Sequence, residues 1–470
     1  MDLIVIGAGP GGYETAVEAV RRGYDVKLVT AGRLGGTCLN LGCIPTKCFC
    51  HDAFHGVVTA DPAKRLAAMI ERKDQVVSTL VAGIERMLKG VEIIYGIARV
   101  VDNRTVAIWR TEDDSASAGI ANEAVRTIKA DRIIIATGSH PSWLDIPGAY
   151  TPGVLSSNEI ISLREFPSKL TVIGGGVIGL ELASVFNALG SEVTVIEYCR
   201  NVLPNMDVDL AKRLKQSMAR SGIKFILGAR VTSVAAAGDG QEVFFTLADK
   251  QGSVLSDKVL MACGRTPDMR VVLGCDAIER TRKGIVVDNN MQTTLEGVYA
   301  VGDVNGLCML AHAAVAQGQI ALNHIAATFQ DGNHARPAGN SPLAGPRLEI
   351  MPAAVFTTPP VASVGLSEEQ CKADGIAYKV CKSAYGASGM AMASGQSEGI
   401  CKILVAQPGQ AGYRDGQILG CHIFGANAPE LVSEVAAIMY FNATASDLAS
   451  MIHPHPSLSE LLLSAVKNGV

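Results

Sequence analysis

The sequence predicts an α/β protein with two similar α/β units and a C-terminal α+β region. Twice, at residues 3–22 and 170–189, a short apolar run of the buried-strand type leads at once into a glycine-rich turn and then into a helical pattern. Beyond residue 346 several runs alternate apolar and polar residues, without such a turn. The composition agrees, because 49 glycines and 5% aromatic residues suit folds with tight strand-to-helix turns.

The first unit contains a glycine fingerprint. The apolar run 3–6 is followed by a helical pattern at 13–22 and a second apolar run at 26–29. The turn between the first run and the helix contains Gly7, Gly9 and Gly12. In this setting glycines let the backbone approach a pyrophosphate at the helix N-terminus, where free N–H groups favour anions. We therefore predict a Rossmann-like dinucleotide-binding domain.

The second unit repeats the pattern with an apolar run at 170–173, a helix at 180–189 and a strand at 192–196. Its fingerprint glycines are Gly174, Gly176 and Gly179. The last strand leads into Glu197, at a position where a carboxylate accepts both ribose hydroxyls and repels a 2′-phosphate, so NAD(H) is expected rather than NADP(H). Arg200 follows closely and leaves NADP(H) open. Two bound dinucleotides are thus expected.

The first unit differs at the corresponding position, where Thr30 replaces the acid. A threonine offers one neutral hydrogen bond, whereas a carboxylate makes two charge-assisted bonds, each about twice as strong. The first site either has help from another residue or holds its adenosine less tightly.

Further segments complete these units and the C-terminal region. The runs 132–138 and 258–265 each close one nucleotide unit. The run 297–303 ends in Asp303, which is expected to meet a polar cofactor chain, to cap a helix, or to do both. Residues 330–347 are expected to be a linker. The C-terminal region is predicted to form strands at 352–365, 400–405 and 418–424 and helices at 428–440 and 457–467. We assign it to assembly and to completing the active site.

A cysteine pair follows the first unit, in the run Gly-Gly-Thr-Cys-Leu-Asn-Leu-Gly-Cys-Ile-Pro-Thr-Lys at 35–47. As a structural disulfide, Cys38 and Cys43 would close a loop of about six residues, contributing at best roughly 2 kcal/mol. A redox-active pair beside a nucleotide is favoured over two buried free thiols. Pro45 fits a helix that starts near Cys43, where the helix dipole stabilises a thiolate.

Charge and cysteine usage restrict the class of protein. The net charge is −4 with acidic and basic residues interspersed, so we expect no nucleic-acid partner and no anionic lipid surface. No apolar run approaches the roughly 18 residues of a membrane span, and a strand from Leu3 leaves no room for a signal peptide, so a cytoplasmic protein is expected. His51 and His55 are spaced like metal ligands but have no evident third ligand, and no metal is expected.

Together with His-Pro-Ser-Leu-Ser-Glu at 455–460, these motifs resemble the FAD-dependent pyridine nucleotide disulfide oxidoreductases over essentially the whole chain. The resemblance implies an FAD-binding domain at 1–140 completed by 268–340, an NAD-binding domain at 141–267 and a dimerisation domain at 346–470. It also implies a homodimer in which a histidine of one subunit reaches the disulfide of the other.

The resemblance also implies roles for individual residues. Cys43 would be the thiol next to FAD, Cys38 the interchange thiol, and His455 the acid and base, held by Glu460. The remaining catalytic residues would be Lys47 and Glu181, as an ion pair near the flavin. The FAD contacts would be Gly7, Gly9, Gly12, Thr30, Gly36, Thr37, Lys47, Ala98, Thr137, Gly138, Asp303 and Ala311, and the NAD contacts Gly174, Gly176, Gly179, Glu197, Val231 and Gly264.

Several structural alternatives remain open at this point. Glu460 and Ser457 also spell a capping box for the last helix. Lys47 and Glu181 could be solvated surface charges. His453 could be confused with the base, although the spacing to Glu460 selects His455.

Within this family the resemblance is strongest to the enzymes that oxidise dihydrolipoamide with NAD⁺. The expected partner is then a lipoyl-bearing acyltransferase or carrier protein of a 2-oxo acid dehydrogenase or glycine cleavage complex. The alternatives are an NAD(P)H-dependent reductase of a glutathione-type or mycothiol-type disulfide, or a flavin-dependent transhydrogenase.

Overall fold

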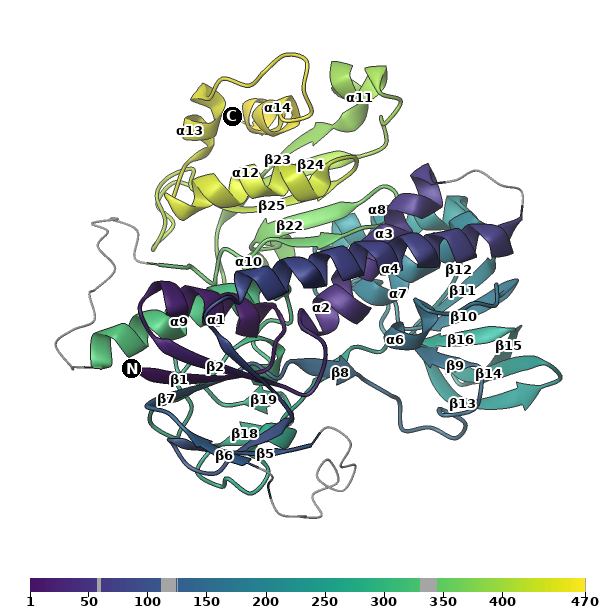
Figure 1. Cartoon of the computed structure of the whole chain (residues 1–470). Helices are drawn as coiled ribbons and strands as arrows, with labels where there is room; N and C mark the ends of the chain where they lie inside the picture. Colours follow the sequence, from purple (N-terminus) through teal and green to yellow (C-terminus); the bar gives the residue numbers. More distant parts are fainter. Residues whose placement is uncertain (57–60, 111–123, 125, 330–344, 470) are drawn as a thin grey trace. The chain divides into compact units, whose positions relative to one another are not determined.

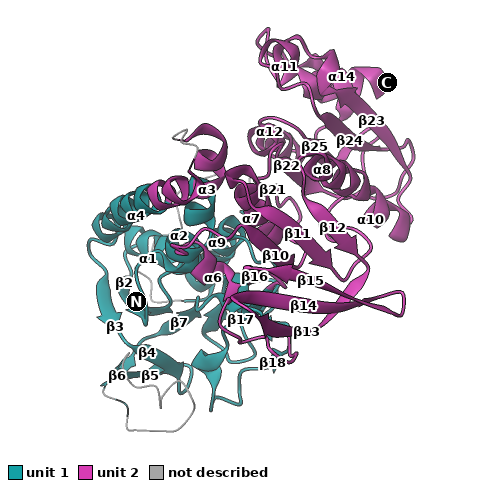
Figure 2. Cartoon of the chain, turned by 90° about the vertical axis from the view of Figure 1, so that its right-hand side faces the viewer, with its two compact units in different colours: residues 1–48, 70–142, 265–348 teal, residues 49–69, 143–264, 349–470 magenta. Residues whose placement is uncertain are grey.

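The computed structural model describes residues 1–56, 61–110, 124, 126–329 and 345–469 (Figure 1). The described chain forms two compact units, shown in teal and magenta in Figure 2. Unit 1 comprises residues 1–48, 70–142 and 265–348, and unit 2 comprises 49–69, 143–264 and 349–470. Most of the expected linker lies outside the described residues.

Unit 1 is built around a five-stranded parallel sheet in the order β20-β7-β1-β2-β3. Its strands are β1 (Asp2–Ile6), β2 (Asp25–Thr30), β3 (Glu92–Tyr95), β7 (Arg132–Ile135) and β20 (Val298–Ala300). Strands with both faces covered are apolar throughout, and the last four residues of β1 are buried. The helices α1 (Pro10–Arg21) and α9 (Ala311–Thr328) pack together in this unit.

Helix α1 starts three residues earlier than the periodicity predicts. Gly9 is its N-cap and Pro10 its first residue, a position where the missing N–H of proline costs nothing. The fingerprint turn is therefore shorter than the sequence suggests, and Gly12 lies inside the first helical turn.

The nucleotide-binding part of unit 2 repeats this plan with a parallel sheet in the order β12-β11-β10-β16-β9. The strands are β9 (Val154–Ser156), β10 (Lys169–Ile173), β11 (Glu192–Glu197), β12 (Lys224–Leu227) and β16 (Lys258–Met261). Helix α7 (Val177–Leu189) follows the fingerprint, and α8 (Val208–Arg220) begins after Asp207, its N-cap. The repeated unit is confirmed.

The C-terminal region forms an antiparallel sheet in the order β21-β22-β25-β24-β23. Its strands are β21 (Ala353–Val355), β22 (Val361–Gly365), β23 (Tyr378–Ala384), β24 (Ile400–Ala406) and β25 (Ile418–Phe424). The predicted strand at 352–365 is two strands, because Pro359 and Pro360 between them cannot donate ladder hydrogen bonds.

One face of this sheet packs against α12 (Ala428–Tyr440), α13 (Ala445–Ser450) and α14 (Glu460–Gly469) in a continuous apolar core. Cys401, Ile403, Cys421 and Ile423 belong to that core. Because side chains alternate along a strand, Lys402 and His422 point to the opposite face. The mixed α/β class with a separate C-terminal α+β region is as predicted.

Other elements carry no fingerprint and were not predicted. They are α4 (Pro62–Met87), the antiparallel sheet of β4 (Ile97–Val100), β5 (Thr105–Trp109) and β6 (Arg126–Lys129), and the antiparallel sheet of β13 (Ala229–Ala237), β14 (Gly240–Leu247) and β15 (Lys250–Ser256). Within the described ranges, the helices are too short or too polar to cross a membrane.

Candidate active site

The two predicted redox cysteines lie on consecutive helices of unit 1. Cys38 is in α2 (Gly36–Leu41), and Cys43 is the first residue of α3 (Cys43–His55), as predicted. Both side chains are half-buried, and the two thiol groups are hydrogen-bonded to each other. The pair is therefore close enough in space to exchange a proton.

The two sulfur atoms differ electrostatically. The hydrogen bond to Cys43, burial, and the charge of Cys43 raise the pKa of the Cys38 thiol, while Lys47 opposes this shift. The two thiols therefore titrate as a pair. The position of Cys43 at a helix N-terminus favours a thiolate there.

The first glycine fingerprint has the shape that a pyrophosphate requires. A Cβ on Gly12 would lie 1.8 Å from the Gly7 carbonyl oxygen, and one on Gly36 would lie 2.6 Å from Gly9 Cα. A Cβ on Gly9 would meet no described atom within 4 Å, so the turn is open there. Among the described residues no side chain caps α1, which leaves its N-terminus available to an anion. These features fit FAD.

Asp303 lies in a polar cluster that the sequence did not reveal. Ser139 Oγ donates to Asp303 Oδ2 at 2.5 Å, and Arg265 donates to Ser139 Oγ at 2.7 Å. Arg265 Nε is also 3.8 Å from Asp303 Oδ2. The interpretation of Asp303 as a helix N-cap is wrong, because it lies inside a short 3-10 helix whose N-cap is Val301.

Arg265 lies within electrostatic reach of both Asp303 and Cys43. Burial lowers the pKa of Arg265, while the charges of Asp303 and Cys43 oppose that shift. The only sequence signal for this residue was its position directly after Gly264, at the end of a strand-to-turn segment.

Thr30 satisfies its hydroxyl locally. Its Oγ1 donates to the Gly32 carbonyl at 3.1 Å and accepts from the Gly32 amide at 3.3 Å. A hydroxyl that closes its own turn has less capacity left for a ribose. The weaker adenosine contact expected at Thr30 thus stays a prediction with a structural reason.

The second fingerprint has the same shape but a different strand end. A Cβ on Gly179 would lie 2.2 Å from the Gly174 carbonyl oxygen, whereas one on Gly176 would meet no described atom within 4 Å. Glu197 accepts hydrogen bonds from the amides of Gly175 at 2.5 Å and Cys199 at 2.6 Å. Each carboxylate oxygen keeps a further lone pair for a ribose hydroxyl. The residues fit a pyridine nucleotide.

The other predicted cofactor contacts lie at turns and strand ends of their units. Thr137 donates to the Asp268 carbonyl at 2.7 Å, and both Gly138 and Gly264 have positive φ, at 75° and 104°. The rest are Thr37 in α2, Ala98 in β4, Ala311 at the start of α9, and Val231 in β13.

Glu181 is buried within α7, with 2% of its surface exposed, and it accepts from the Phe356 amide at 2.9 Å. The alternative that it is a solvated surface charge is therefore wrong. Lys47 is partly buried and belongs to unit 1, and its pairing with Glu181 of unit 2 stays a prediction.

His455 and Glu460 form a hydrogen-bonded dyad in unit 2. Nδ1 of His455 is 3.0 Å from Glu460 Oε1, and 81% of the His455 side chain is exposed. The Ser457 amide donates to Glu460 Oε2 at 2.9 Å. That amide, together with His455, lowers the pKa of Glu460. Glu460 thus holds the imidazole and remains ionised.

The capping-box interpretation of Glu460 is only half right. Glu460 is itself the first residue of α14, and among the described residues the hydroxyl of Ser457 has no hydrogen-bond partner. Glu460 therefore binds the Ser457 amide without the reciprocal bond that a capping box needs.

The neighbouring His453 has a different environment. Its side chain is buried, and its Nε2 is 2.8 Å from Glu434 Oε1 in α12. An exposed imidazole oriented by a carboxylate suits proton transfer to a substrate, which favours His455.

The structure thus groups the predicted residues in two sets. The thiol pair, Lys47, the first fingerprint and Asp303 lie in unit 1, whereas the second fingerprint, Glu181, Glu197 and the His455 dyad lie in unit 2.

Comparison with known proteins assigns both parts of the chain. Residues 1–318 match the family model "Pyridine nucleotide-disulphide oxidoreductase", and residues 351–466 match its dimerisation domain. A mitochondrial dihydrolipoyl dehydrogenase of Pisum sativum is 34% identical over 482 residues, which cover 99% of this chain and 90% of the relative. A leghemoglobin reductase of Glycine max is 34% identical, over 99% of this chain and 86% of the relative.

Solved structures agree with this assignment. The HOCl-induced flavoprotein disulfide reductase RclA of Escherichia coli superposes with a TM-score of 0.82 at 27% identity, and the match covers 99% of both chains.

Proposed function

Because the chain belongs to the pyridine nucleotide-disulphide oxidoreductases, we propose that it oxidises protein-bound dihydrolipoamide to lipoamide with NAD⁺. Dihydrolipoyl dehydrogenases use FAD and NAD, which the matching domains bind, so these are the cofactors of the chain. We assign FAD to the first fingerprint and NAD to the second. The observation that carries the proposal is the hydrogen-bonded pair of Cys38 and Cys43, on the two helices that follow β2 of the first fingerprint unit.

The pair would work by thiol–disulfide exchange. In the oxidised protein, a thiolate of dihydrolipoamide attacks Cys38 of the disulfide, forms a mixed disulfide, and releases Cys43 as the thiolate. The second substrate thiol then displaces Cys38, which leaves lipoamide and two protein sulfurs carrying two electrons. The flavin supplies the route by which these electrons reach NAD⁺, giving NADH and a proton.

We assign the proton transfers to His455. A dithiol near its ordinary pKa of about 8.5 is mostly protonated at neutral pH, and an imidazole takes its proton at little cost. Nδ1 faces Glu460, which leaves Nε2 for the substrate. Because His455 is exposed and the family has a dimerisation domain, we propose that it serves the thiol pair of the second subunit of a homodimer.

The lipoyl group would be attached to an acyltransferase or carrier protein of a 2-oxo acid dehydrogenase or glycine cleavage complex. We also propose a cytoplasmic location, because the twelve cysteines, apart from those at 38–50, are scattered without the regular spacing of a disulfide framework. Lys47 and Glu181 are proposed to form an ion pair near the flavin.

A second function is favoured by the similarity to a flavoprotein disulfide reductase and to leghemoglobin reductases. The same thiol pair, running in reverse, would reduce a glutathione-type or mycothiol-type disulfide with NADH or NADPH. The Glu197 carboxylate disfavours NADPH in either direction.

The test is a substrate panel on the purified, flavin-loaded full chain. Dihydrolipoamide with NAD⁺ and with NADP⁺ is compared with lipoamide, glutathione disulfide and mycothiol disulfide supplied with NADH or NADPH. We expect the highest kcat/KM with dihydrolipoamide and NAD⁺. A higher value with glutathione disulfide or mycothiol disulfide would contradict the lipoamide assignment.

A further inference from the structure

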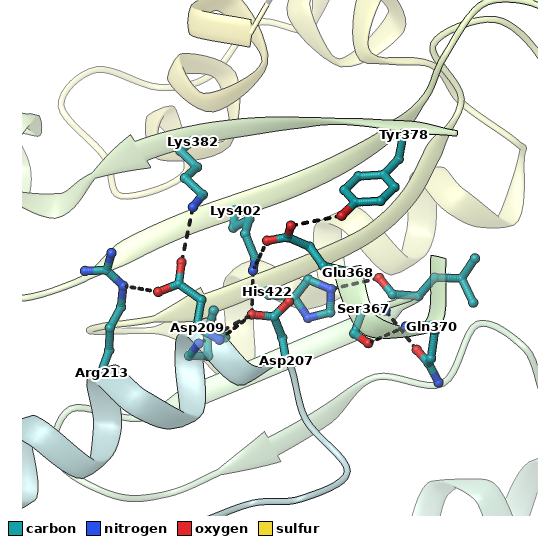
Figure 3. Close-up of polar contacts among 12 residues, drawn as sticks. Asp207, Asp209, Arg213, Ser367, Glu368, Gln370, Tyr378, Lys382, Lys402 and His422 are labelled. Carbon is teal, nitrogen blue, oxygen red and sulfur yellow. Dashed lines mark hydrogen bonds and ion pairs between the residues drawn. The ribbon is translucent and has the colours of Figure 1, made fainter. Parts of the chain in front are cut away.

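Unit 2 contains a buried charge cluster that the proposed chemistry does not use (Figure 3). The side chain of Lys402, in β24, is fully buried, and its Nζ contacts Asp207 Oδ1 at 2.5 Å and Glu368 Oε1 at 2.9 Å. The side chain of Asp207 is also fully buried. One lysine of the C-terminal sheet thus joins two carboxylates, and one of them comes from the nucleotide-binding part.

The cluster is ionised in spite of its burial. Burial alone would lower the pKa of Lys402, but its hydrogen bonds to Asp207 and Glu368 raise that pKa above its ordinary value. For Asp207, burial is outweighed by the hydrogen bond from Lys402 and by nearby positive charge, so its pKa lies below the ordinary range. A buried charge that loses its partner is strongly destabilised, so neither residue tolerates the loss of the other.

The remaining members of the cluster, His422 and Tyr378, come from strands of the C-terminal sheet. His422 pairs directly with Lys402 across β24 and β25, and its Nε2 is 2.8 Å from the Leu366 carbonyl oxygen. Burial lowers the pKa of His422, and its Nε2 donates to that carbonyl. Tyr378 donates to Glu368 Oε2 at 3.0 Å.

Asp207 has a second role on the nucleotide side. It is the N-cap of α8, and its Oδ1 accepts from the amides of Asp209 at 3.1 Å and Leu210 at 3.4 Å. It therefore fixes the point where the segment 198–206 ends and α8 begins. The segment starts directly after Glu197.

This segment packs on the second fingerprint. The amide of Leu203 donates to the Gly175 carbonyl at 2.9 Å, and Leu203 is held at a positive φ of 46°. A Cβ on Gly175 would lie 3.2 Å from both Glu197 Oε2 and Val202 Cγ1. Gly175, the Glu197 carboxylate and the segment 198–206 are therefore close-packed. A shift of the segment would thus displace Gly175 and Glu197 as well.

We propose that Lys402 is a positioning residue for the pyridine nucleotide, because it fixes Asp207 and thereby holds the segment 198–206 against Gly175 and Glu197. This rests on the proposed assignment of NAD to the second fingerprint. The contacts of Lys402 Nζ are to Asp207 and Glu368. Its effect reaches the nucleotide only through Asp207.

The test measures NAD⁺ binding to the oxidised holoenzyme by isothermal titration calorimetry, without a disulfide substrate. In Lys402→Met and in the isosteric Asp207→Asn, we expect the Kd for NAD⁺ to rise by about tenfold or more. The KM for NAD⁺ should rise with it, while kcat at saturating NAD⁺ and the KM for dihydrolipoamide stay within about twofold. Amide hydrogen exchange of 198–206 should accelerate in the variants before NAD⁺ is added.

Two control variants separate positioning from stability. Glu368→Gln removes the other carboxylate of Lys402 and leaves the bond to Asp207 in place, so NAD⁺ affinity should persist even if the melting temperature falls. Lys382→Met removes the half-exposed pair between Lys382 in β23 and Asp209 in α8, 3.2 Å apart, and should change neither quantity.

The proposal is overturned if Lys402→Met and Asp207→Asn are less stable but bind NAD⁺ as tightly as the unsubstituted chain. It is also overturned if Glu368→Gln weakens NAD⁺ binding as much as Asp207→Asn does. If Lys402→Met does not fold, Asp207→Asn alone decides between these outcomes, since it preserves shape and volume. Failure of the proposed function looks different, because the unsubstituted chain would then bind no NAD⁺ or turn over no dihydrolipoamide.

Discussion

The two fingerprint units share their backbone geometry but differ at the end of their second strand. In both, the glycine five residues after the first one lies against the carbonyl oxygen of that first glycine, and a middle glycine leaves the turn open. The first unit then ends its strand with Thr30, whose hydroxyl is used by Gly32, and the second with the carboxylate of Glu197. A shared turn therefore specifies a pyrophosphate, while the strand end specifies the nucleoside.

The segments that follow these strand ends differ as well. In the first unit, the chain passes directly into α2 and α3 and delivers Cys38 and Cys43. In the second, it packs on Gly175 and ends at Asp207, which Lys402 holds. The first unit thus carries chemistry after its fingerprint, and the second carries a fixed binding surface.

The largest effect should come from filling the glycine contacts. Gly12→Ala puts a Cβ 1.8 Å from a carbonyl oxygen in the first unit, and Gly179→Ala puts one 2.2 Å from the equivalent oxygen in the second. We expect Gly12→Ala to be purified without flavin, and Gly179→Ala to keep flavin but lose measurable NAD⁺ binding. Flavin absorbance and calorimetry report the two outcomes.

The matched control for these variants is Gly83→Ala in α4, where a new Cβ would meet no described atom within 4 Å. It should keep both cofactors. If Gly12→Ala retained flavin while Gly179→Ala lost it, the assignment of FAD to the first unit would be wrong.

The first unit holds the thiols, but the base proposed for them, His455, lies in the second unit. Replacing His455 should give the next largest effect. His455→Gln should lower kcat with dihydrolipoamide by about 10²–10⁴-fold, the usual contribution of a positioned acid–base group. His453→Gln changes the buried neighbour instead and should act mainly on thermal stability. Equal losses of kcat in the two variants would remove the reason for choosing His455.

The buried ion pair of Lys402 and Asp207 in the second unit predicts that stability depends on pH. In the native chain the lowered pKa of Asp207 contributes stability above the unfolded value of about 3.9, and this is lost as the pH falls through the folded pKa. In Lys402→Met the buried carboxylate has no cation, so its folded pKa rises above the unfolded value and its charge destabilises the fold as the pH increases.

Urea unfolding of Lys402→Met and the native chain at pH 4 and pH 7 measures this effect. The difference in free energy of unfolding should be about 3–5 kcal/mol at pH 7 and smaller at pH 4. A difference that is the same at both pH values would mean that lost packing, not charge, is responsible.

The smallest effect is expected from exchanging the strand ends themselves. Thr30→Glu should slow flavin release in mild urea, and Glu197→Thr should weaken NAD⁺ binding, each by about tenfold, because charge-assisted bonds to a ribose are about twice as strong as neutral ones. Flavin fluorescence measures flavin release, and calorimetry measures NAD⁺ binding. Flavin retention that is complete in the native chain and unchanged in Thr30→Glu would show that Thr30 does not limit FAD binding.

Much of this architecture could be predicted because its signals are local. A buried strand, a glycine turn and a helix lie within about 20 residues of each other, and both units were found from that pattern. Cys43 at a helix start followed from Pro45, and the strands β24 and β25 followed from the alternation of their residues.

What could not be predicted depends on residues far apart in the chain. Lys402 stands between two core residues of an alternating strand, where a charged side chain usually faces water, and its partner Asp207 is 195 positions away. Arg265 and Ser139 are similarly separated by 126 positions. The hydroxyl of Thr30 could be judged only once its turn to Gly32 was known.

The central claim is that Cys38 and Cys43 carry the electrons, and Cys38→Ser tests it most directly. Turnover of dihydrolipoamide with NAD⁺ is measured on the flavin-loaded variant, with Cys50→Ser, a half-buried thiol of the same helical segment, as the control. We predict a loss of about a thousandfold or more in Cys38→Ser with flavin still bound, and near-native turnover in Cys50→Ser. Undiminished turnover in Cys38→Ser would contradict the account.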